Sequence, residues 1–128
     1  MPPPIPSEVA AALSLLPPRT ATLRALIFAA AEATHTLPLT ECLKWGQPAY
    51  LPAKKAGTTL RLGATDGLPT LFVPCSTTLL DSYRATFPTE FTYLGSRAVV
   101  LPASAPFPEA AFQHIAAMAL TYHRDKRR

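Results

Sequence analysis

Cysteine, glycine and acidic residues are scarce in this chain of 128 residues, and export or membrane signals are missing. The only two cysteines, Cys42 and Cys75, form no Cys-x-x-Cys pair, so neither a zinc site nor a disulfide framework is indicated. No uncharged apolar run reaches the roughly 18 residues that cross a bilayer, and the first residues carry no export signal. We therefore expect a cytoplasmic protein with no membrane contact.

The sequence motifs of common catalytic and metal sites are missing as well. The histidines show no His-Glu-x-x-His spacing, no serine lies in a Gly-x-Ser-x-Gly elbow, and there is no glycine-rich phosphate loop. We predict no catalytic residues, no metal ligands and no cofactor. A binding protein is expected rather than an enzyme, although Glu41 beside Lys44 is chemically conceivable as a general base.

Positive charge is concentrated near the C-terminal end of the sequence. The formal net charge is +4, from 12 Lys plus Arg against 8 Asp plus Glu. Residues 123–128 hold four of the bases and one acid, a net of +3 that leaves +1 for residues 1–122. Nucleic acid is therefore not the expected partner of the domain body. The basic tail, residues 124–128, keeps weak nucleic-acid binding open, although a solvated chain end explains it equally.

Amphipathic segments separated by proline make up the rest of the chain. Apolar residues form 48% of the sequence, and the 15 prolines fall between periodic segments. This composition predicts one domain over residues 1–128, with a core at about 19–123 and a proline-rich start at 1–6.

The spacing of the apolar residues distinguishes helices from strands. Helical periodicity predicts helices at 7–16, 19–34, 76–86 and after Pro108, with Ser7 and Ser76 as N-caps. Alternation and short apolar runs predict strands at 43–45, 58–63, 71–73, 91–94 and 97–101. Asp66-Gly67 and Gly95-Ser96 are suited to hairpin turns, the second to type II′.

The predicted order of elements is α-α-β-β-β-α-β-β-α. Hairpins with few crossovers indicate an α+β two-layer sandwich, in which a mostly antiparallel five-stranded sheet carries helices on one face. An exposed sheet edge or an uncovered sheet face could pair two copies of the chain, so a homodimer remains an open alternative.

The segment from Glu41 to Tyr50 is the strongest candidate for a binding site, because it contains the only tryptophan, Trp45. We predict that Trp45 lies on a strand, where it either belongs to the core or stacks on a ligand. Glu41 and Lys44 form either a surface ion pair or the polar rim of a pocket whose floor is Trp45 and Tyr50.

Cationic residues and a helix start elsewhere in the chain are candidates for the same pocket. The residues concerned are Lys44, Arg61, Ser76, Thr77, Thr78 and Arg97. If they converge, they form a cationic pocket for a small carboxylate or phosphate ligand. The hydroxyl residues have an alternative role as helix caps. Cys75, beside them, is either an inert thiol or one activated by the helix start.

Several of these residues resemble the motifs of a known family. Glu41-x-x-Lys44-Trp45-Gly46-x-Pro48-x-Tyr50, Thr77-Thr78-Leu79, Gly95-x-Arg97-Ala98 and Tyr122-His123 resemble the YdhG-like bacterial domain of unknown function, over roughly residues 19–123. The resemblance implies a small cytosolic domain of the frataxin-like fold group. It also implies an iron-chaperone role proposed for some members, in which carboxylates hold the metal. The eight acids of this chain are spread out, with none adjacent.

Three functional hypotheses follow from these patterns. The leading one is a non-enzymatic domain that binds a small anionic ligand, or a protein partner, around Trp45, Tyr50 and the cationic residues. The second is the iron-binding chaperone implied by the resemblance. The third is a weak nucleic-acid binder that uses the basic tail.

Overall fold

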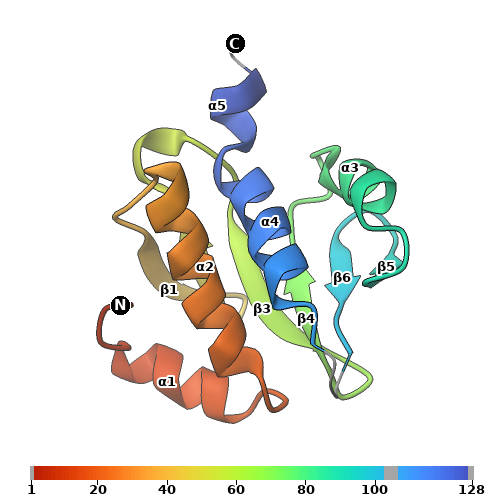
Figure 1. The fold of residues 1–128 in the computed structure, drawn as a ribbon. Helices are drawn as coiled ribbons and strands as arrows, with labels where there is room; N and C mark the ends of the chain where they lie inside the picture. The colour runs from red at the N-terminus through yellow and green to blue at the C-terminus, as the bar shows by residue number, and fades with distance from the viewer. Residues whose placement is uncertain (1, 103–106, 127–128) are drawn as a thin grey trace.

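The computed structural model describes residues 2–102 and 107–126 and contains one six-stranded antiparallel sheet with helices packed against it (Figure 1). The helices are α1 (Ser7–Ser14), α2 (Thr20–Thr34), α3 (Leu79–Thr86), α4 (Glu109–Leu120) and α5 (Tyr122–Lys126), with a 3-10 turn at Ala53–Lys55. The strands are β1 (Thr40–Lys44), β2 (Gln47–Leu51), β3 (Leu60–Thr65), β4 (Leu68–Phe72), β5 (Thr92–Leu94) and β6 (Ala98–Val100).

The strands follow the spatial order β1-β2-β3-β4-β6-β5, and every neighbouring pair is antiparallel. Helices α2 and α4 lie side by side across one face of the sheet (Figure 1). Helix α3 packs beside α4, since the hydroxyl of Tyr83 donates to the carbonyl oxygen of Ile115 at 2.7 Å. The predicted α+β class with an antiparallel sheet is confirmed, whereas the predicted strand count and element order are not.

The prediction of five strands is wrong at Trp45. Residues 40–51 form two strands, and Trp45 with Gly46 forms the two-residue turn between them. Both turn residues have positive φ, 57° for Trp45 and 75° for Gly46, which is the requirement of a type I′ turn. Bulky residues rarely adopt this conformation. Of the usual Asn-Gly or Asp-Gly turn pair, the sequence therefore contains only the glycine, Gly46. Helix α5 was not predicted either.

Of the other two hairpins, one has the predicted turn at Asp66-Gly67, while the connection at Gly95-Ser96 is one residue longer than the predicted type II′ turn. Asp66 and Gly67 connect β3 to β4 with φ of 51° and 78°, as expected for an Asp-Gly turn. The connection from β5 to β6 has three residues, 95–97, because Leu94 pairs with Ala98. Arg97 therefore lies in the turn and not on the predicted strand.

The predicted serine N-caps are not formed. Helix α1 has Pro6 at its N-cap position and α3 has Thr78, and neither residue makes a side-chain capping hydrogen bond. Ser7 is instead the first helical residue of α1, and Ser76 lies two positions before the α3 cap. The helix starts were thus predicted within a few residues, while their capping chemistry was not.

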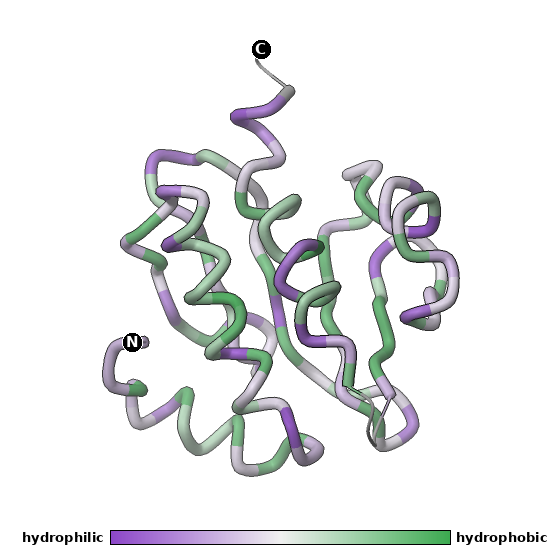
Figure 2. Tube along the Cα trace, in the orientation of Figure 1, coloured by the Kyte–Doolittle hydropathy of each residue, from purple (hydrophilic) through white to green (hydrophobic). Residues whose placement is uncertain are grey.

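The core fills the space between the helices and the inner face of the sheet. Its largest fully buried side chains include Leu23, Ile27, Tyr50, Leu60, Leu62, Leu71, Tyr83, Phe112 and Ile115. Figure 2 shows hydrophobic residues recurring along α2, α4 and the strands between them, whereas α5 is mainly hydrophilic. The strand residues of the core are paired with one another across neighbouring strands, so they share one face.

The intervening strand residues point to the opposite face, which we call the outer face. The register places most of them in two rows across the sheet, flanked by the pairs Thr40–Leu51 and Thr65–Leu68. One row contains Cys42, Ala49, Arg61, Phe72, Ala98 and Leu94. The adjacent row contains Lys44, Gln47, Gly63, Thr70, Val100 and Thr92. Arg61 and Lys44 are the charged members of these rows, and neither row contains a carboxylate.

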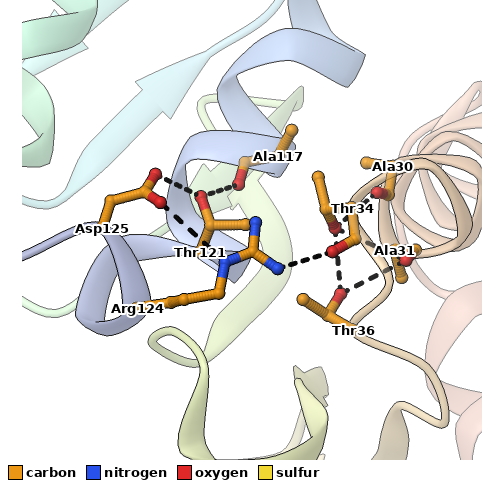
Figure 3. A network of polar contacts seen from close by, with 8 residues as sticks. All are labelled: Ala30, Ala31, Thr34, Thr36, Ala117, Thr121, Arg124 and Asp125. Carbon is orange, nitrogen blue, oxygen red and sulfur yellow. Dashed lines mark hydrogen bonds and ion pairs between the residues drawn. The ribbon is translucent and has the colours of Figure 1, made fainter. Parts of the chain in front are cut away.

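Part of the predicted basic tail is built into the fold (Figure 3). The guanidinium of Arg124 donates from Nη1 to the carbonyl oxygen of Thr34, the last residue of α2, at 2.7 Å. Its backbone N–H donates to the carbonyl oxygen of Ala56 at 2.7 Å. Helix ends carry unpaired carbonyls and partial negative charge, which a cation stabilises. Residues 127–128 of the predicted tail lie outside the described residues.

Replacing Arg124 with methionine is expected to lower the free energy of unfolding by about 1–2 kcal/mol, because the Thr34 carbonyl loses a charge-assisted hydrogen bond while most of the side-chain stem is kept. Urea denaturation monitored by circular dichroism measures the change. Lys55→Met, at an exposed cation on the 3-10 turn, is the matched control and should change stability by less than about 0.5 kcal/mol. Equal effects of the two variants would contradict the docking role of Arg124.

Candidate functional site

Glu41 pairs with Arg24 of α2 and not with Lys44. Arg24 Nε lies 2.6 Å from Glu41 Oε2, and Arg24 Nη2 lies 2.8 Å from Glu41 Oε1, so the pair is bidentate. Both side chains are only 6% exposed, and hydrogen bonding to Glu41 raises the pKa of Arg24. The same guanidinium donates to the carbonyl oxygen of Pro3 at 2.8 Å. Glu41 is thus a structural anchor and offers no free carboxylate to a ligand.

Tyr50 and Trp45 lie in opposite environments and do not form a common pocket floor. Tyr50 is fully buried on the inner face, opposite Glu41 in the strand register, and edge-on to Phe28 at a centroid distance of 5.9 Å. Burial raises the pKa of its phenol far above the ordinary value, and the hydroxyl forms no geometrically acceptable hydrogen bond. Trp45 is 89% exposed at the tip of the β1–β2 hairpin. Tyr50 is therefore a core residue and not a pocket floor, whereas the core alternative for Trp45 is wrong.

Arg61 lies on the outer face, in contact with two residues from neighbouring strands. Its Nη1 donates to Oε1 of Gln47 at 3.2 Å, and its guanidinium carbon lies 5.8 Å from the ring centroid of Phe72. Gln47 and Phe72 both extend over Gly63, where an added Cβ would be 2.6 Å from Gln47 Nε2 and 2.9 Å from the Phe72 ring. Lys44 stands opposite Gln47 in the register and is exposed.

A shallow pocket of about 450 Å³ adjoins Phe72 on the outer face. Its lining residues are Thr65, Phe72, Cys75, Leu94, Gly95, Ser96, Arg97 and Ala98. Arg97 is the only charged residue among them. Because β4 lies between β3 and β6, Phe72 stands between Arg61 on one side and Arg97 on the other. We call these three residues the Arg-Phe-Arg cluster.

Carboxylates near the outer face lie in its connections and not on its strands. Asp66 is in the β3–β4 turn, and Glu90 precedes β5 and lines a separate pocket of about 220 Å³. The described strands carry one acid, Glu41, which faces the helices and is neutralised by Arg24. The outer face is therefore positively charged, even though the domain body as a whole is nearly neutral.

Ser76, Thr77 and Thr78, the predicted helix start, do not line the pocket beside Arg97. Thr77 Oγ1 donates to the carbonyl oxygen of Pro74 at 2.9 Å, and the backbone N–H of Thr78 donates to the hydroxyl of Tyr122 at 3.1 Å. Ser76 is exposed. Only Cys75, just before this start, reaches the pocket beside Arg97, and it is an exposed thiol and not a buried one.

Sequence reasoning missed the aromatic centre of the site. Phe72 was assigned only to an apolar strand, and Gln47 to no role. A signal did exist, because a two-residue turn at Asp66-Gly67 fixes the register of β3 and β4 and places residue 72 opposite Arg61. Continuing the alternation from the buried Leu71 then puts Phe72 on the same face as Arg61.

A second pocket was also unforeseen. It has a volume of about 480 Å³ and lies between α2, residues 2–3 and residues 37–39. Its lining residues are Pro2, Pro3, Ala25, Phe28, Ala29, Glu32, Leu37, Pro38 and Leu39. Glu32 is the only charged residue among the described residues that line it, and this negative charge is opposite to that of the Arg-Phe-Arg cluster and does not favour an anion.

Metal-ligating side chains do not gather in the described part of the chain: no group of three or more His, Cys, Asp or Glu residues there could hold a metal ion. The iron-chaperone hypothesis therefore gains no support from the described side chains.

Within residues 2–102 and 107–126, no helix is both long and apolar enough to span a bilayer.

Comparisons of this chain with protein-family models, with curated proteins and with solved structures each gave no match. The resemblance to the YdhG-like domain stays a prediction that depends on the quoted residues. The fold and the site by themselves define the class: a small α+β domain with a six-stranded antiparallel sheet, whose outer face combines arginine and aromatic side chains.

Proposed function

We propose that this chain is a non-enzymatic binding domain for a small organic anion, which binds at the Arg-Phe-Arg cluster. The observation that carries the proposal is the position of Phe72 between two arginines, on the sheet face to which the described strands contribute no carboxylate. Arginine is suited to this role because its planar guanidinium binds carboxylate and phosphate groups through two parallel hydrogen bonds.

The shape and lining of the pocket indicate which anion fits. A volume of about 450 Å³ is within the range of small-molecule sites. Phe72, Leu94 and Ala98 provide apolar contacts, while Arg97 supplies the charge. The best match is a carboxylate or phosphate attached to a flat apolar body, with the body against Phe72 and the anionic group at the guanidinium.

The lining residues support binding rather than catalysis. Cys75 is the only nucleophilic thiol among them, and no histidine or carboxylate accompanies it as a base. Arginine side chains are permanent cations in proteins and do not act as general acids or bases. The pocket thus has groups that hold an anion and no pair of groups that would transform it.

Titration with 1-naphthoate and with inorganic phosphate, followed by amide NMR shifts, tests the proposal. We expect both probes to shift the amides of residues 94–98, and 1-naphthoate to bind more tightly because its rings contact Phe72. Arg97→Gln should weaken both about tenfold, the loss expected for one charge-assisted hydrogen-bonding group.

Lys54→Gln is the matched control for this experiment, because it removes one exposed positive charge outside the pocket. It should leave both dissociation constants unchanged within about twofold. Shifts spread evenly over the surface, or equal weakening by Lys54→Gln and Arg97→Gln, would show a general charge effect and refute a specific anion site.

A further inference from the structure

Trp45 is the least explained residue of the structure. It occupies the first position of the β1–β2 turn with φ of 57°, and 89% of its surface is exposed. Within the described residues, no hydrogen bond, ring contact or cation contact involves its side chain. Within the described residues, the Trp45 side chain therefore makes no contact that would stabilise the fold.

Both the backbone and the solvent disfavour a tryptophan there. A left-handed conformation is unfavourable for a bulky L-residue, and asparagine or glycine is the usual residue at this position of a type I′ turn. A fully exposed indole also leaves the largest apolar side chain in water. Unfavourable local choices of this kind concentrate at functional sites, where an external contact compensates for them.

The surroundings of Trp45 indicate the chemistry of that contact. Lys44 precedes it on β1, and the row that contains Lys44 and Gln47 adjoins the row that contains Arg61 and Phe72. From β1 to β6 the face spans four strand spacings, about 19 Å. Along this span Lys44, Arg61 and Arg97 supply positive charge and Phe72 supplies aromatic surface, and Trp45 stands exposed at the hairpin tip next to Lys44.

We infer that the outer face binds a single-stranded nucleic acid, with a base stacked on Trp45 and the phosphates running past Lys44, Arg61 and Arg97. Proteins that bind single strands combine a positive track for the backbone with aromatic platforms for the bases, and base stacking is tolerant of sequence. A duplex fits less well, because its bases are already stacked and cannot meet the indole.

Charge selects this partner over a protein surface. The charged side chains along the track are all cations, and the acids Asp66 and Glu90 lie in connections between elements and not on the strands. A polymer with regularly spaced phosphates can place a phosphate next to each of these cations. The inference goes beyond the small-anion site, with which it shares Arg61 and Arg97, and it adds Trp45 and Lys44.

Fluorescence anisotropy with a labelled oligothymidine of about 12 nucleotides tests the inference. The logarithm of the affinity should fall against the logarithm of the salt concentration with a slope of about −2, as expected for three phosphate contacts on a single strand. Trp45→Asn should weaken binding about tenfold or more, the loss expected for one stacked base. The variant should remain folded, since asparagine suits this position of the turn.

Two controls separate stacking from charge. Leu15→Asn changes another highly exposed apolar residue, 87% exposed at the end of α1, and should leave the affinity unchanged. Heparin, a polyanion without bases, should bind wild type and Trp45→Asn equally. Trp45→Asn should also retain wild-type binding of 1-naphthoate, so that failure of this inference and failure of the small-anion site can be distinguished.

Three results would overturn the inference. The first is no binding of the oligothymidine at low salt by a folded wild-type protein. The second is equal affinity of wild type and Trp45→Asn for the oligothymidine, which would reduce the face to a general polyanion surface. The third is a wild-type dimer that Trp45→Asn dissociates, because Trp45 would then be a contact between two copies of the chain.

Discussion

Replacing Gly57 with alanine is expected to cost about 3–5 kcal/mol of unfolding free energy, one of the largest effects of any single methyl group in this protein. A Cβ at residue 57 would collide with the backbone oxygen of Ala119 and the backbone carbonyl of Leu120. These atoms cannot move aside, because Thr58 N–H donates to Ala119 O at 2.9 Å and holds the two segments together. The end of α4 would have to shift away from the sheet.

Gly67→Ala is the control for this prediction. Gly67 has φ of 78° but open space around the position of a Cβ, so alanine there is strained without any collision. We expect a loss of only about 1 kcal/mol. Thermal and urea denaturation of both variants measure the difference, and a loss at residue 57 no greater than that at residue 67 would show that the close approach of the two segments is not essential.

Glu41→Gln is expected to destabilise the fold by about 3–5 kcal/mol, because it leaves the guanidinium of Arg24 buried without its counter-charge. Arg24 is 5% exposed and has its other hydrogen bond to Pro3, a neutral carbonyl that cannot balance the charge. Equilibrium unfolding in urea measures the loss. The residues 2–3 that Arg24 holds against α2 should also become more accessible to protease.

Removing both charges tests the cause of that loss. The double variant Arg24→Met with Glu41→Leu keeps apolar volume at both positions and leaves no unpaired buried charge, so most of the lost stability should return. If the double variant is as unstable as Glu41→Gln alone, the hydrogen bond to Pro3 and the contact of Arg24 with Phe28 contribute more than the ion pair does.

Periodicity was a sound guide to elements whose signal is local. Helix α2 was predicted at residues 19–34 and observed at Thr20–Thr34, because its apolar stripe repeats with the helical period. The Asp66-Gly67 turn was likewise found where its residues allow positive φ. The β1–β2 hairpin was missed because tryptophan is not a residue expected at a turn position with positive φ. Local propensity therefore did not predict the turn at Trp45.

The candidate site was only partly within reach of the sequence. Arg61, Arg97 and Lys44 were identified as cations that could converge. The structure places Arg61 and Lys44 on the outer face and Arg97 in the β5–β6 turn, and of the three only Arg97 lines the pocket. The role of Glu41 was not foreseen, because its partner Arg24 lies 17 positions away on a helix, and no pattern in the chain relates the two.

By itself, the sequence determined the α+β class, the helices with a clear apolar stripe, the Asp-Gly hairpin and a set of candidate cations, since these depend on residue type and on spacing within a few positions. Only the tertiary structure decided which face of the sheet each residue occupies, that Glu41 is paired with Arg24, and that Trp45 is exposed while Tyr50 is buried. The physical reason is that a strand presents alternate residues to opposite faces, so one unrecognised turn changes the surroundings of every residue near it.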